Sequence, residues 1–447
     1  MEKLREYVRI SKETPTSPND VYCYLHAVLD DTEKLIVNDT KKQTLEELAR
    51  WTGHPVAQRA KDVISARSAQ RRCDLLRKLI KTKRLHFAMK VLGTLSSRMS
   101  GGSESDGAEK STKLNIQGIP REQAIRSLFL LAFQDEHLEG GDFDAFEVSI
   151  ADAVYSDPKL HDILVSGNKI HTVVGCKLYG LTAEQVNATK GSTDDKYTRS
   201  KNCFFAWLYL GSIRRIAKTG NVEEAVAEQL VKWLAWEFPE IAKKQKELVK
   251  RFTPLQQPMG PGTAIHSTEP EEYAESLLGF KRYFTLEWAI IRGLYKLANH
   301  YPNEWDSIRG EIRRTDRLQT MARACCSALY AAIFGLQGHV ARAAANHYIQ
   351  SPGAQITKKL QRNIWDLQPI GIGPWVVRPV NAHDEVLCPT TLCYQISNHT
   401  LITSQPMDST LMNSSTQVVL DTIEQLRCKV PLLAMKWKPN LKNWGEK

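Results

Sequence analysis

The sequence predicts an α+β fold in which helices predominate and a small antiparallel sheet lies apart from them. Three observations predict it. Apolar residues recur at helical spacing through residues 158–250 and 315–366. A strand-like run at 138–143 leads directly into a helical pattern at 147–154. Residues 374–396 alternate like the two arms of a β-hairpin. Strands and helices are therefore segregated along the chain.

Length and net charge limit the classes of protein to which the chain can belong. The chain has 447 residues, and its 60 Lys and Arg residues exceed its 50 Asp and Glu residues, giving a net charge of +10. This length allows two or three domains with their own cores. A basic balance favours a polyanionic partner, because phosphate backbones release counterions when Lys and Arg bind them. Many proteins are mildly basic, so the net charge alone does not identify the partner.

Several classes of protein find no support in the motifs. The nine cysteines form no C-x-x-C pair and show no zinc-ligand spacing, which favours a reducing compartment. No P-loop motif is present. The first residues are charged rather than apolar, and the longest apolar run, 324–336, is too short to cross a bilayer. We therefore expect a cytoplasmic protein without a membrane partner.

The remaining elements follow in chain order. Residues 1–98 read as helix, and their basic run at 58–90 is either a solvated face or a phosphate-binding one. Residues 99–113 read as a loop, 128–133 as a second strand, and 253–263 as a Pro- and Gly-rich break. Helices are expected again at 271–300 and at 416–428, followed by a tail that contains tryptophan.

Two aspartates occupy positions suited to metal binding. Asp142 ends the strand in the segment GGDFD, and Asp384 lies at the turn of the predicted hairpin. A sheet that brought them together could hold two Mg²⁺ ions, which need only one or two carboxylates besides phosphates and water. The alternative is that Asp384 is an ordinary turn residue.

Two helical faces carry polar and aromatic groups at i, i+4 and i+8. Lys201, Phe205 and Tyr209 share one face, which suits a phosphate and a stacked base or sugar. The alternative is a buried helix whose Lys201 lies at an exposed end. On a second helix, Arg342, Asn346 and Gln350 alternate with small alanines. They could reach acceptors in a minor groove, or they could form a polar solvent-facing surface.

Taken in order, these segments resemble the polymerase region of family A (polymerase I-like) DNA polymerases, most closely the phage type. Residues 98–100 and 115–120 (NIQGIP) are similar to the family's R-L-S and N-L-Q-N-I-P segments. Residues 141–147 resemble motif A, 201–209 motif B and 383–385 (HDE) motif C. Residues 157–160, 169–172 and 342–350 resemble the segments that accompany these motifs.

The resemblance implies a right-hand polymerase with an antiparallel-sheet palm, mostly helical fingers and a truncated helical thumb. The partial thumb would be residues 1–98, the palm 99–157 with motif A and 339–447 with motif C, and the fingers 158–338. No segment for a proofreading exonuclease is evident in residues 1–98.

The resemblance also implies roles for individual residues. Asp142 and Asp384 would bind the metals, and Glu385 would tune their site. Lys201 and His171 would hold the triphosphate, Phe205 would pack on the sugar, and Glu147 with Tyr209 would exclude a 2′-hydroxyl. The primer–template minor groove would be followed by Arg98, Gln117, Arg342, Asn346 and Gln350, and the primer end would be contacted by His383.

The implied function is template-directed addition of dNTPs to a primer 3′ end by two-metal phosphoryl transfer, in viral DNA replication. Its cofactors would be two Mg²⁺ ions, with Mn²⁺ as an alternative. Its partners would be primer–template DNA, dNTPs and a separate exonuclease or processivity chain, in the host cytoplasm if a phage encodes it. The alternative is a catalytically weak DNA-binding remnant, or one subunit of a split polymerase.

The chain departs from the family pattern at motifs A and B. In motif A, Asp144, Ala145 and Ser149 stand where cellular members have other residues. Tyr197 stands where the family has an arginine four residues before the motif B lysine, and we expect the nearby Arg199 to substitute for it. Leu210 stands where a glycine usually follows the motif B tyrosine.

Overall fold

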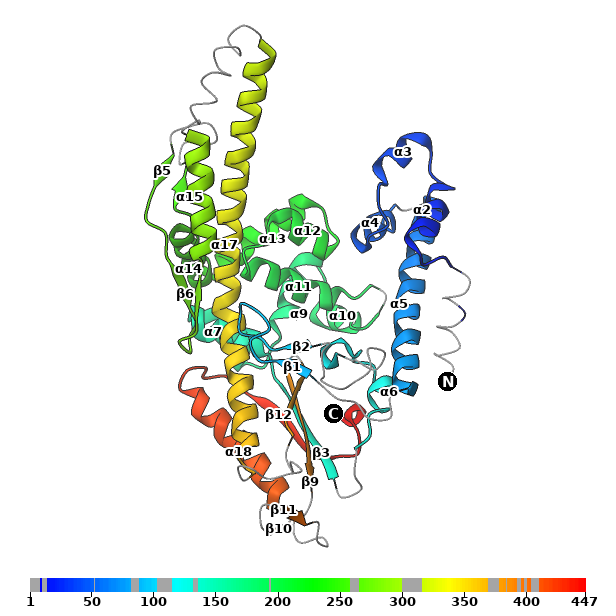
Figure 1. Ribbon diagram of the computed structural model, residues 1–447, viewed down its shortest axis with the longest axis vertical. Coiled ribbons are helices and arrows are strands. Elements are labelled where there is room, and N and C mark those ends of the chain that lie inside the picture. Colours follow the sequence, from blue (N-terminus) through cyan, green and yellow to red (C-terminus); the bar gives the residue numbers. More distant parts are fainter. Residues whose placement is uncertain are drawn as a thin grey trace. The chain divides into compact units, whose positions relative to one another are not determined.

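The computed structural model is an α+β protein in which helical residues greatly outnumber strand residues, as the sequence predicts (Figure 1). It describes residue 9 and residues 14–51, 53–81, 88–102, 115–131, 136–192, 194–257, 265–299, 316–368, 378–382, 384–391, 395–397, 400–402 and 410–447. The chain forms two compact units. The first comprises residues 1–88 and 101–118, and the second comprises residues 89–100 and 119–447.

The first unit is a small helical bundle. Its helices are α2 (Pro18–His26), α3 (Asp31–Ile36), α4 (Lys42–Leu48) and α5 (Pro55–Lys81), followed by the 3₁₀ helix η2 (Ile116–Gly118). Leu25, Leu45 and Val63 are fully or almost fully buried at its centre. Within the predicted basic run on α5, Arg67 is structural, because its Nε donates to the Thr16 carbonyl at 3.1 Å. Other basic side chains on α5, such as Arg71, remain exposed.

The second unit contains a four-stranded antiparallel sheet in the order β12-β3-β9-β8. Its strands are β3 (Glu136–Phe143), β8 (Val380–Ala382), β9 (Glu385–Thr391) and β12 (Met435–Leu441). Two glycines let both neighbours of β3 approach closely. A Cβ on Gly141 would lie 2.8 Å from the Lys436 carbonyl oxygen on β12, and one on Gly140 would lie 2.8 Å from Leu387 on β9.

Helices α17 (Asp316–Trp365) and α18 (Thr410–Arg427) pack with this sheet, and α7 (Phe146–Tyr155) packs on α17. The long α17 helix crosses α7 closely at Gly353, where an added Cβ would lie 3.2 Å from Phe146 and 3.3 Å from Ile150. Behind the sheet, the fully buried Glu139 carboxylate accepts hydrogen bonds from His137, Ser415 and Trp437. The helices and the sheet therefore share one core, which fixes the ends of β3 and β9.

A helical region follows α7 in the chain. Its helices are α8 (Pro158–Val165), α9 (Ile170–Tyr179), α10 (Ala183–Ala188), α11 (Lys196–Leu208), α12 (Ile213–Gly220), α13 (Glu224–Glu237), α14 (Pro239–Phe252) and α15 (Thr285–Asn299). The fully buried Asp157 caps the N-termini of two of these helices. Its carboxylate accepts from Lys159 N in α8 at 3.1 Å and from Glu240 N in α14 at 3.0 Å. Its side chain thus joins the start of α8 to the start of α14.

Several predicted boundaries were wrong. The helix expected from 271 begins at Thr285, because residues 273–283 form the hairpin of β6 (Tyr273–Glu275) and β7 (Lys281–Tyr283). The strand expected at 128–133 is absent from residues 128–131, which follow the short helix α6 (Gln123–Arg126). The tail contributes β12 to the sheet. Short strands also occur at β1 (Ala88–Lys90), β2 (Ser100–Gly102), β4 (Leu255–Gln256), β5 (His266–Ser267), β10 (Gln395–Ser397) and β11 (Thr400–Ile402). Among the described helices, none combines the length and apolar composition that a membrane crossing needs.

Candidate active site

Asp142 lies near the end of β3, and Asp384 lies in the turn that leads into the neighbouring strand β9. Asp142 pairs with Glu385 in the β3–β9 register, and the Phe143 amide approaches the Asp384 carbonyl at 3.5 Å. Asp142 is exposed, and the side chain of Asp384 is 36% exposed. The pKa of Asp142 is raised chiefly by partial burial of its carboxyl group; Lys447 and Arg121 oppose the shift, and the Glu385 and Asp384 carboxylates add to it. The sheet therefore gathers carboxylates whose mutual repulsion a bound cation would relieve.

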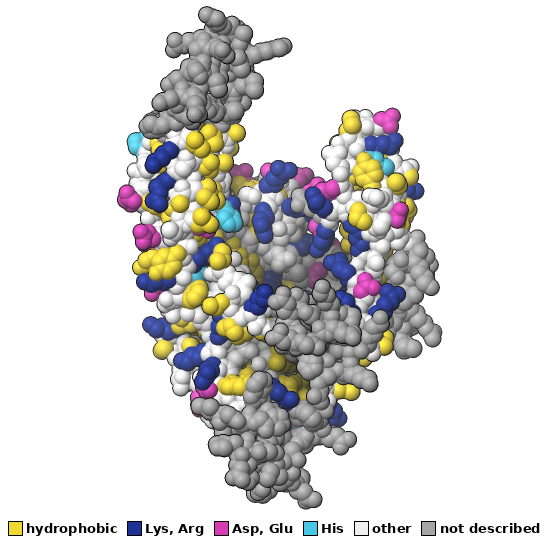
Figure 2. Space-filling view, viewed as in Figure 1, with side chains coloured by type: hydrophobic (Ala, Val, Ile, Leu, Met, Phe, Trp, Pro, Cys, Tyr) yellow, Lys and Arg dark blue, Asp and Glu magenta, His cyan; other side chains and the backbone are white. Residues whose placement is uncertain are grey.

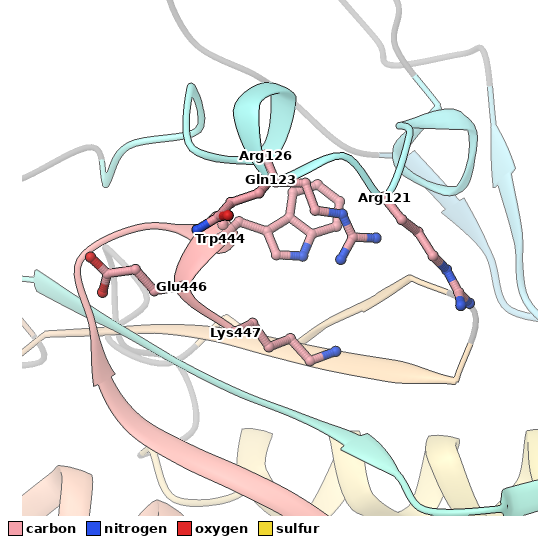
Figure 3. Close-up of a pocket in the computed structure, with 7 residues that line it drawn as sticks. Arg121, Gln123, Arg126, Trp444, Glu446 and Lys447 are labelled. Atoms are coloured by element: carbon pink, nitrogen blue, oxygen red, sulfur yellow. The ribbon is translucent and has the colours of Figure 1, made fainter. Parts of the chain in front are cut away.

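Glu385, by contrast, is enclosed by donors. Its residue is 5% exposed, and its carboxylate accepts from Arg126 at 3.0 Å, from Lys447 at 2.8 Å and from the Trp444 indole at 2.5 Å. The Arg126 guanidinium lies 4.4 Å from the centre of the Trp444 ring, and Figure 3 shows the two side chains overlapping. These groups line a pocket of about 300 Å³ with Arg121 and Gln123. The Glu385 charge is thus neutralised within the protein.

Glu147 and Asp384 share a cation. The Nη2 atom of Arg98 lies 2.7 Å from Glu147 Oε1 and 3.8 Å from Asp384 Oδ1. The pKa of Glu147 is raised, chiefly by burial and further by Asp384, while Arg98 and Lys201 oppose the shift. Glu147 is thereby close enough to interact with both Lys201 and Asp384, although three separate elements supply these residues.

Helix α11 has the two faces that the sequence predicts. Cys203, Phe204, Trp207 and Leu208 are buried, whereas Lys201 is exposed and Phe205 and Tyr209 are half-buried. The Phe205 and Tyr209 rings lie nearly parallel, with centroids 6.0 Å apart, and Lys201 Nζ lies 5.9 Å from the Phe205 ring. This face therefore presents an ammonium group beside two stacked rings.

His171, in the first turn of α9, faces the same surface. Its ring centroid lies 5.7 Å from that of Phe205 and 5.9 Å from that of Tyr197. Burial, reinforced by Lys201 and Lys169, lowers the pKa of His171 to about 3. Its Nδ1 atom is buried without a hydrogen-bond partner among the described residues. His171 thus presents a neutral imidazole with one unused polar atom.

The C-terminal end of α11 is a Schellman turn. The Gly211 amide donates to Ala206 O at 2.6 Å, and the Leu210 amide donates to Trp207 O at 3.0 Å. Leu210 accordingly has φ = +58°, a left-handed conformation that favours glycine. Burial and the neighbouring Glu147 raise the pKa of Tyr209, the residue just before this turn. The turn fixes Tyr209 at the end of the polar face.

Helix α17 presents the second predicted face. Arg342 is exposed and Asn346 and Gln350 are half-buried, whereas Ala345, His347 and Ile349 between them are buried. Gln350 lies next to the Tyr209 hydroxyl group. The Asn346 Oδ1 atom is buried without a partner within the described chain. The stripe therefore continues the surface formed by α11.

Two predicted residues lie elsewhere. Gln117 belongs to the first unit, where its Oε1 atom accepts from the Gly101 amide at 3.3 Å. His383 lies outside the described residues. Arg199, the expected substitute for the family arginine, is ion-paired with Asp194.

A divalent metal ion fits the pair of aspartates. Among the residues that the structure describes, no group of three or more His, Cys, Asp or Glu side chains is arranged to hold a metal. Mg²⁺ does not require such a group, because water and substrate phosphates complete its shell. The accessible carboxylates of Asp142 and Asp384, at the end of β3 and in the turn before the adjacent strand β9, suit this kind of shared site.

Sequence reasoning missed the groups that enclose Glu385. Arg126, Trp444 and Lys447 had no assigned role, and Arg126 is 259 residues away from Glu385 in the chain. The only signal in the sequence was a tail rich in Trp and Lys. Its placement depends on β12 joining the sheet, which the sequence does not indicate.

Comparisons with known proteins identify the family and support the fold. A family model described as DNA polymerase family A matches residues 2–390. Among solved structures, the chain is similar to the POL domain of Pol1 from M. smegmatis in complex with DNA primer-template and dNTP. The identity is 17% and the TM-score 0.57, with 91% of this chain and 56% of that chain covered. This chain thus spans little more than half the length of that polymerase chain. No curated protein matches it.

Proposed function

The chain belongs to DNA polymerase family A, and we propose that it is a template-directed DNA polymerase that adds dNTPs to a primer 3′ end. The proposal rests mainly on one structural arrangement. Asp142, near the end of β3, and Asp384, in the turn before β9, present accessible carboxylates, and Glu147 interacts both with Asp384 and with Lys201 on the α11 face that carries Phe205 and Tyr209. Phosphoryl transfer needs charge stabilisation and positioning, and this arrangement offers both.

Asp142 and Asp384 would hold two Mg²⁺ ions, or Mn²⁺ in their place. When bound, such ions activate the attacking 3′-hydroxyl and stabilise charge on the transferred phosphate and the leaving oxygen. Glu385 would not bind the metal directly, because its carboxylate already accepts from Arg126, Lys447 and Trp444. Its role would be to hold the turn that carries Asp384.

The remaining residues would bind substrates. Lys201 and the neutral His171 would contact the triphosphate, and Phe205 would pack on the sugar. Glu147, close to Tyr209, would occupy the space that a 2′-hydroxyl needs. Primer–template DNA would lie along Arg98 and the α17 stripe of Arg342, Asn346 and Gln350, with contributions from Gln117 and His383. The buried, unpartnered Asn346 Oδ1 supports the α17 assignment, since such atoms are rare unless a ligand satisfies them.

We further infer a role in DNA replication, of a virus if the phage-type motifs indicate origin. A separate exonuclease or processivity chain would be a further partner. The partial thumb, palm and fingers would follow the boundaries given above.

Primer extension by the purified chain tests the proposal. We expect Mg²⁺-dependent extension that falls by about 10³-fold or more in Asp142→Asn and in Asp384→Asn, with primer–template binding largely kept. Asp144→Asn is the matched control, because Asp144 follows Asp142 by two residues but its carboxylate is paired with Lys436 at 2.9 Å. Parental extension rates in both active-site variants would refute the metal assignment. DNA binding without any extension by the parent would favour the alternative of a catalytically weak remnant.

A further inference from the structure

The α11 surface carries less positive charge than a triphosphate needs. Its assigned cation is Lys201, since His171 beside it is a neutral imidazole. A nucleoside triphosphate carries about four negative charges, of which a single divalent ion offsets two. If the proposed function holds, another cation must approach the phosphate tail on the side of His171 and Tyr197. Such a cation should lie near His171 and Tyr197 and should have no carboxylate partner.

Lys190 meets this requirement. It lies in the loop between α10 and α11, is exposed, and places its Nζ atom 5.4 Å from the centre of the Tyr197 ring. Tyr197 in turn lies edge-on to His171 at 5.9 Å. Because Tyr197, Lys201 and Phe205 recur every four residues on α11, Lys190 extends this face by about one helical turn.

The loop that carries Lys190 is tied to the first turn of α11 on both sides. Before it, the Thr189 Oγ1 atom accepts from the Tyr197 amide at 3.2 Å. After it, the Gly191 amide donates to Asp195 Oδ2 at 2.9 Å, and Asp195 also caps α11 through Thr198 N at 2.8 Å. The backbone of Lys190 is therefore held in register with Tyr197.

The neighbouring acids are already engaged. Asp194 pairs with Arg199 and with Lys196 at 3.6 Å, and Asp195 accepts from Thr198 and Gly191. Within the described part of the chain, Lys190 forms no ion pair of its own. Arg199 cannot take its place at the phosphate tail without breaking its pair with Asp194.

We propose that Lys190 binds the terminal phosphate of the incoming nucleoside triphosphate, with the Tyr197 ring as the platform that positions its ammonium group beside His171. The proposal rests on the proposed function, since it completes the same nucleotide site. In the family pattern, an arginine at the position of Tyr197 would carry this charge. Here Lys190, in the loop before α11, would carry it instead.

The effect of the γ-phosphate on binding is the decisive readout. We expect Lys190→Ala to raise the KM for a dNTP by about 10-fold or more and to leave kcat within about 3-fold, because a charge-assisted contact to the substrate is lost. In calorimetric titrations with Mg²⁺, the parent should bind dATP more tightly than dADP, and Lys190→Ala should lose most of that preference. Lys190→Arg should retain it.

Matched variants separate this role from a structural one. Lys177→Ala is the control, since Lys177 is also a surface lysine over a ring, but that ring belongs to Trp233 on α13, 5.8 Å away. Adding Tyr197→Arg to Lys190→Ala should restore the preference for dATP, because it returns a cation to the same face one turn before Lys201.

The failures are distinguishable. A parent chain that neither extends primers nor binds dATP would overturn the proposed function and this inference together. A parent that extends primers while Lys190→Ala keeps the parental KM and dATP preference would overturn the role of Lys190 alone. Loss of the preference in Lys169→Ala but not in Lys190→Ala would do the same, by assigning the charge to Lys169.

Discussion

The guanidinium group of Arg98 lies 2.7 Å from the carboxylate of Glu147 and forms a pair that is only partly exposed. The same nitrogen atom lies 3.8 Å from Asp384. One arginine thereby links the residue proposed to exclude ribonucleotides with a residue proposed to bind metal. Without that cation, burial and the Asp384 charge would both favour protonation of Glu147. Arg98 therefore helps to keep the Glu147 side chain charged and fixed in place.

The first prediction concerns sugar selection. Glu147→Ala should raise the kcat/KM ratio of rNTPs to dNTPs by about 10- to 200-fold, because the space for a 2′-hydroxyl opens. Steady-state kinetics with both nucleotides on one primer–template measure it. Asp144→Ala is the control, since its exposed carboxylate pairs with Lys436 instead. An unchanged ratio in Glu147→Ala would remove this residue from sugar selection.

The second prediction concerns the buried Glu385 cluster. Glu385→Ala should lower the free energy of unfolding by about 3 kcal/mol or more, because it leaves Arg126 and Lys447 buried without their counter-charge. Urea denaturation at constant ionic strength measures it. Lys447→Met should cost less, since Arg126 and Trp444 still satisfy the carboxylate. A Glu385→Ala chain within about 0.5 kcal/mol of the parent would show that the cluster contributes little.

Local patterns predicted the elements that carry the site. The change from strand to helix periodicity around Asp142 is reproduced by β3 and α7, and Asp384 lies at the predicted hairpin turn. The division of α11 into an apolar face and a Lys201 face is also confirmed. Each of these features depends on residues within about two helical turns of one another, and such short-range periodicity is what a sequence shows directly.

Long-range contacts were not predictable in the same way. On β12, Leu441 alone is buried among exposed and half-buried residues, so its sequence reads as a tail although it pairs with β3. The apolar run at 128–131 reads as a strand, yet Leu128 and Leu130 are 57% and 77% exposed. In both places the environment, rather than the local pattern, decides the structure. The enclosure of Glu385 depends on this unforeseen placement of the tail.

The third prediction concerns pH. Because the pKa of His171 is lowered from 6.5 to about 3, the unfolded chain binds a proton there between these values and the folded chain does not. Stability should therefore rise with pH across this window and show no His171 effect above pH 6.5. Unfolding free energies measured from pH 4 to 7 should depend less on pH in His171→Gln than in the parent. Identical slopes would place the folded-state pKa of His171 near its ordinary value.

The fourth prediction concerns the strained turn after α11. Leu210 packs against a hydrophobic cluster but has φ = +58°, so both packing and backbone strain determine the effect of replacing it. Leu210→Ala and Leu210→Gly remove the same packing, and they differ mainly in the left-handed conformation that alanine tolerates poorly. The glycine variant should therefore be the more stable of the two by about 1 kcal/mol.

At the control position, the stability difference between the glycine and alanine variants should have the opposite sign. At Lys246, exposed in the middle of α14, Lys246→Gly should be less stable than Lys246→Ala by about 1 kcal/mol, because the backbone there is right-handed helix. Denaturant unfolding of all four variants gives both differences. If alanine were the more stable residue at position 210 as well, the turn after Tyr209 would have to adopt another conformation in solution. The polar face of α11 would then end differently from the Schellman turn described here.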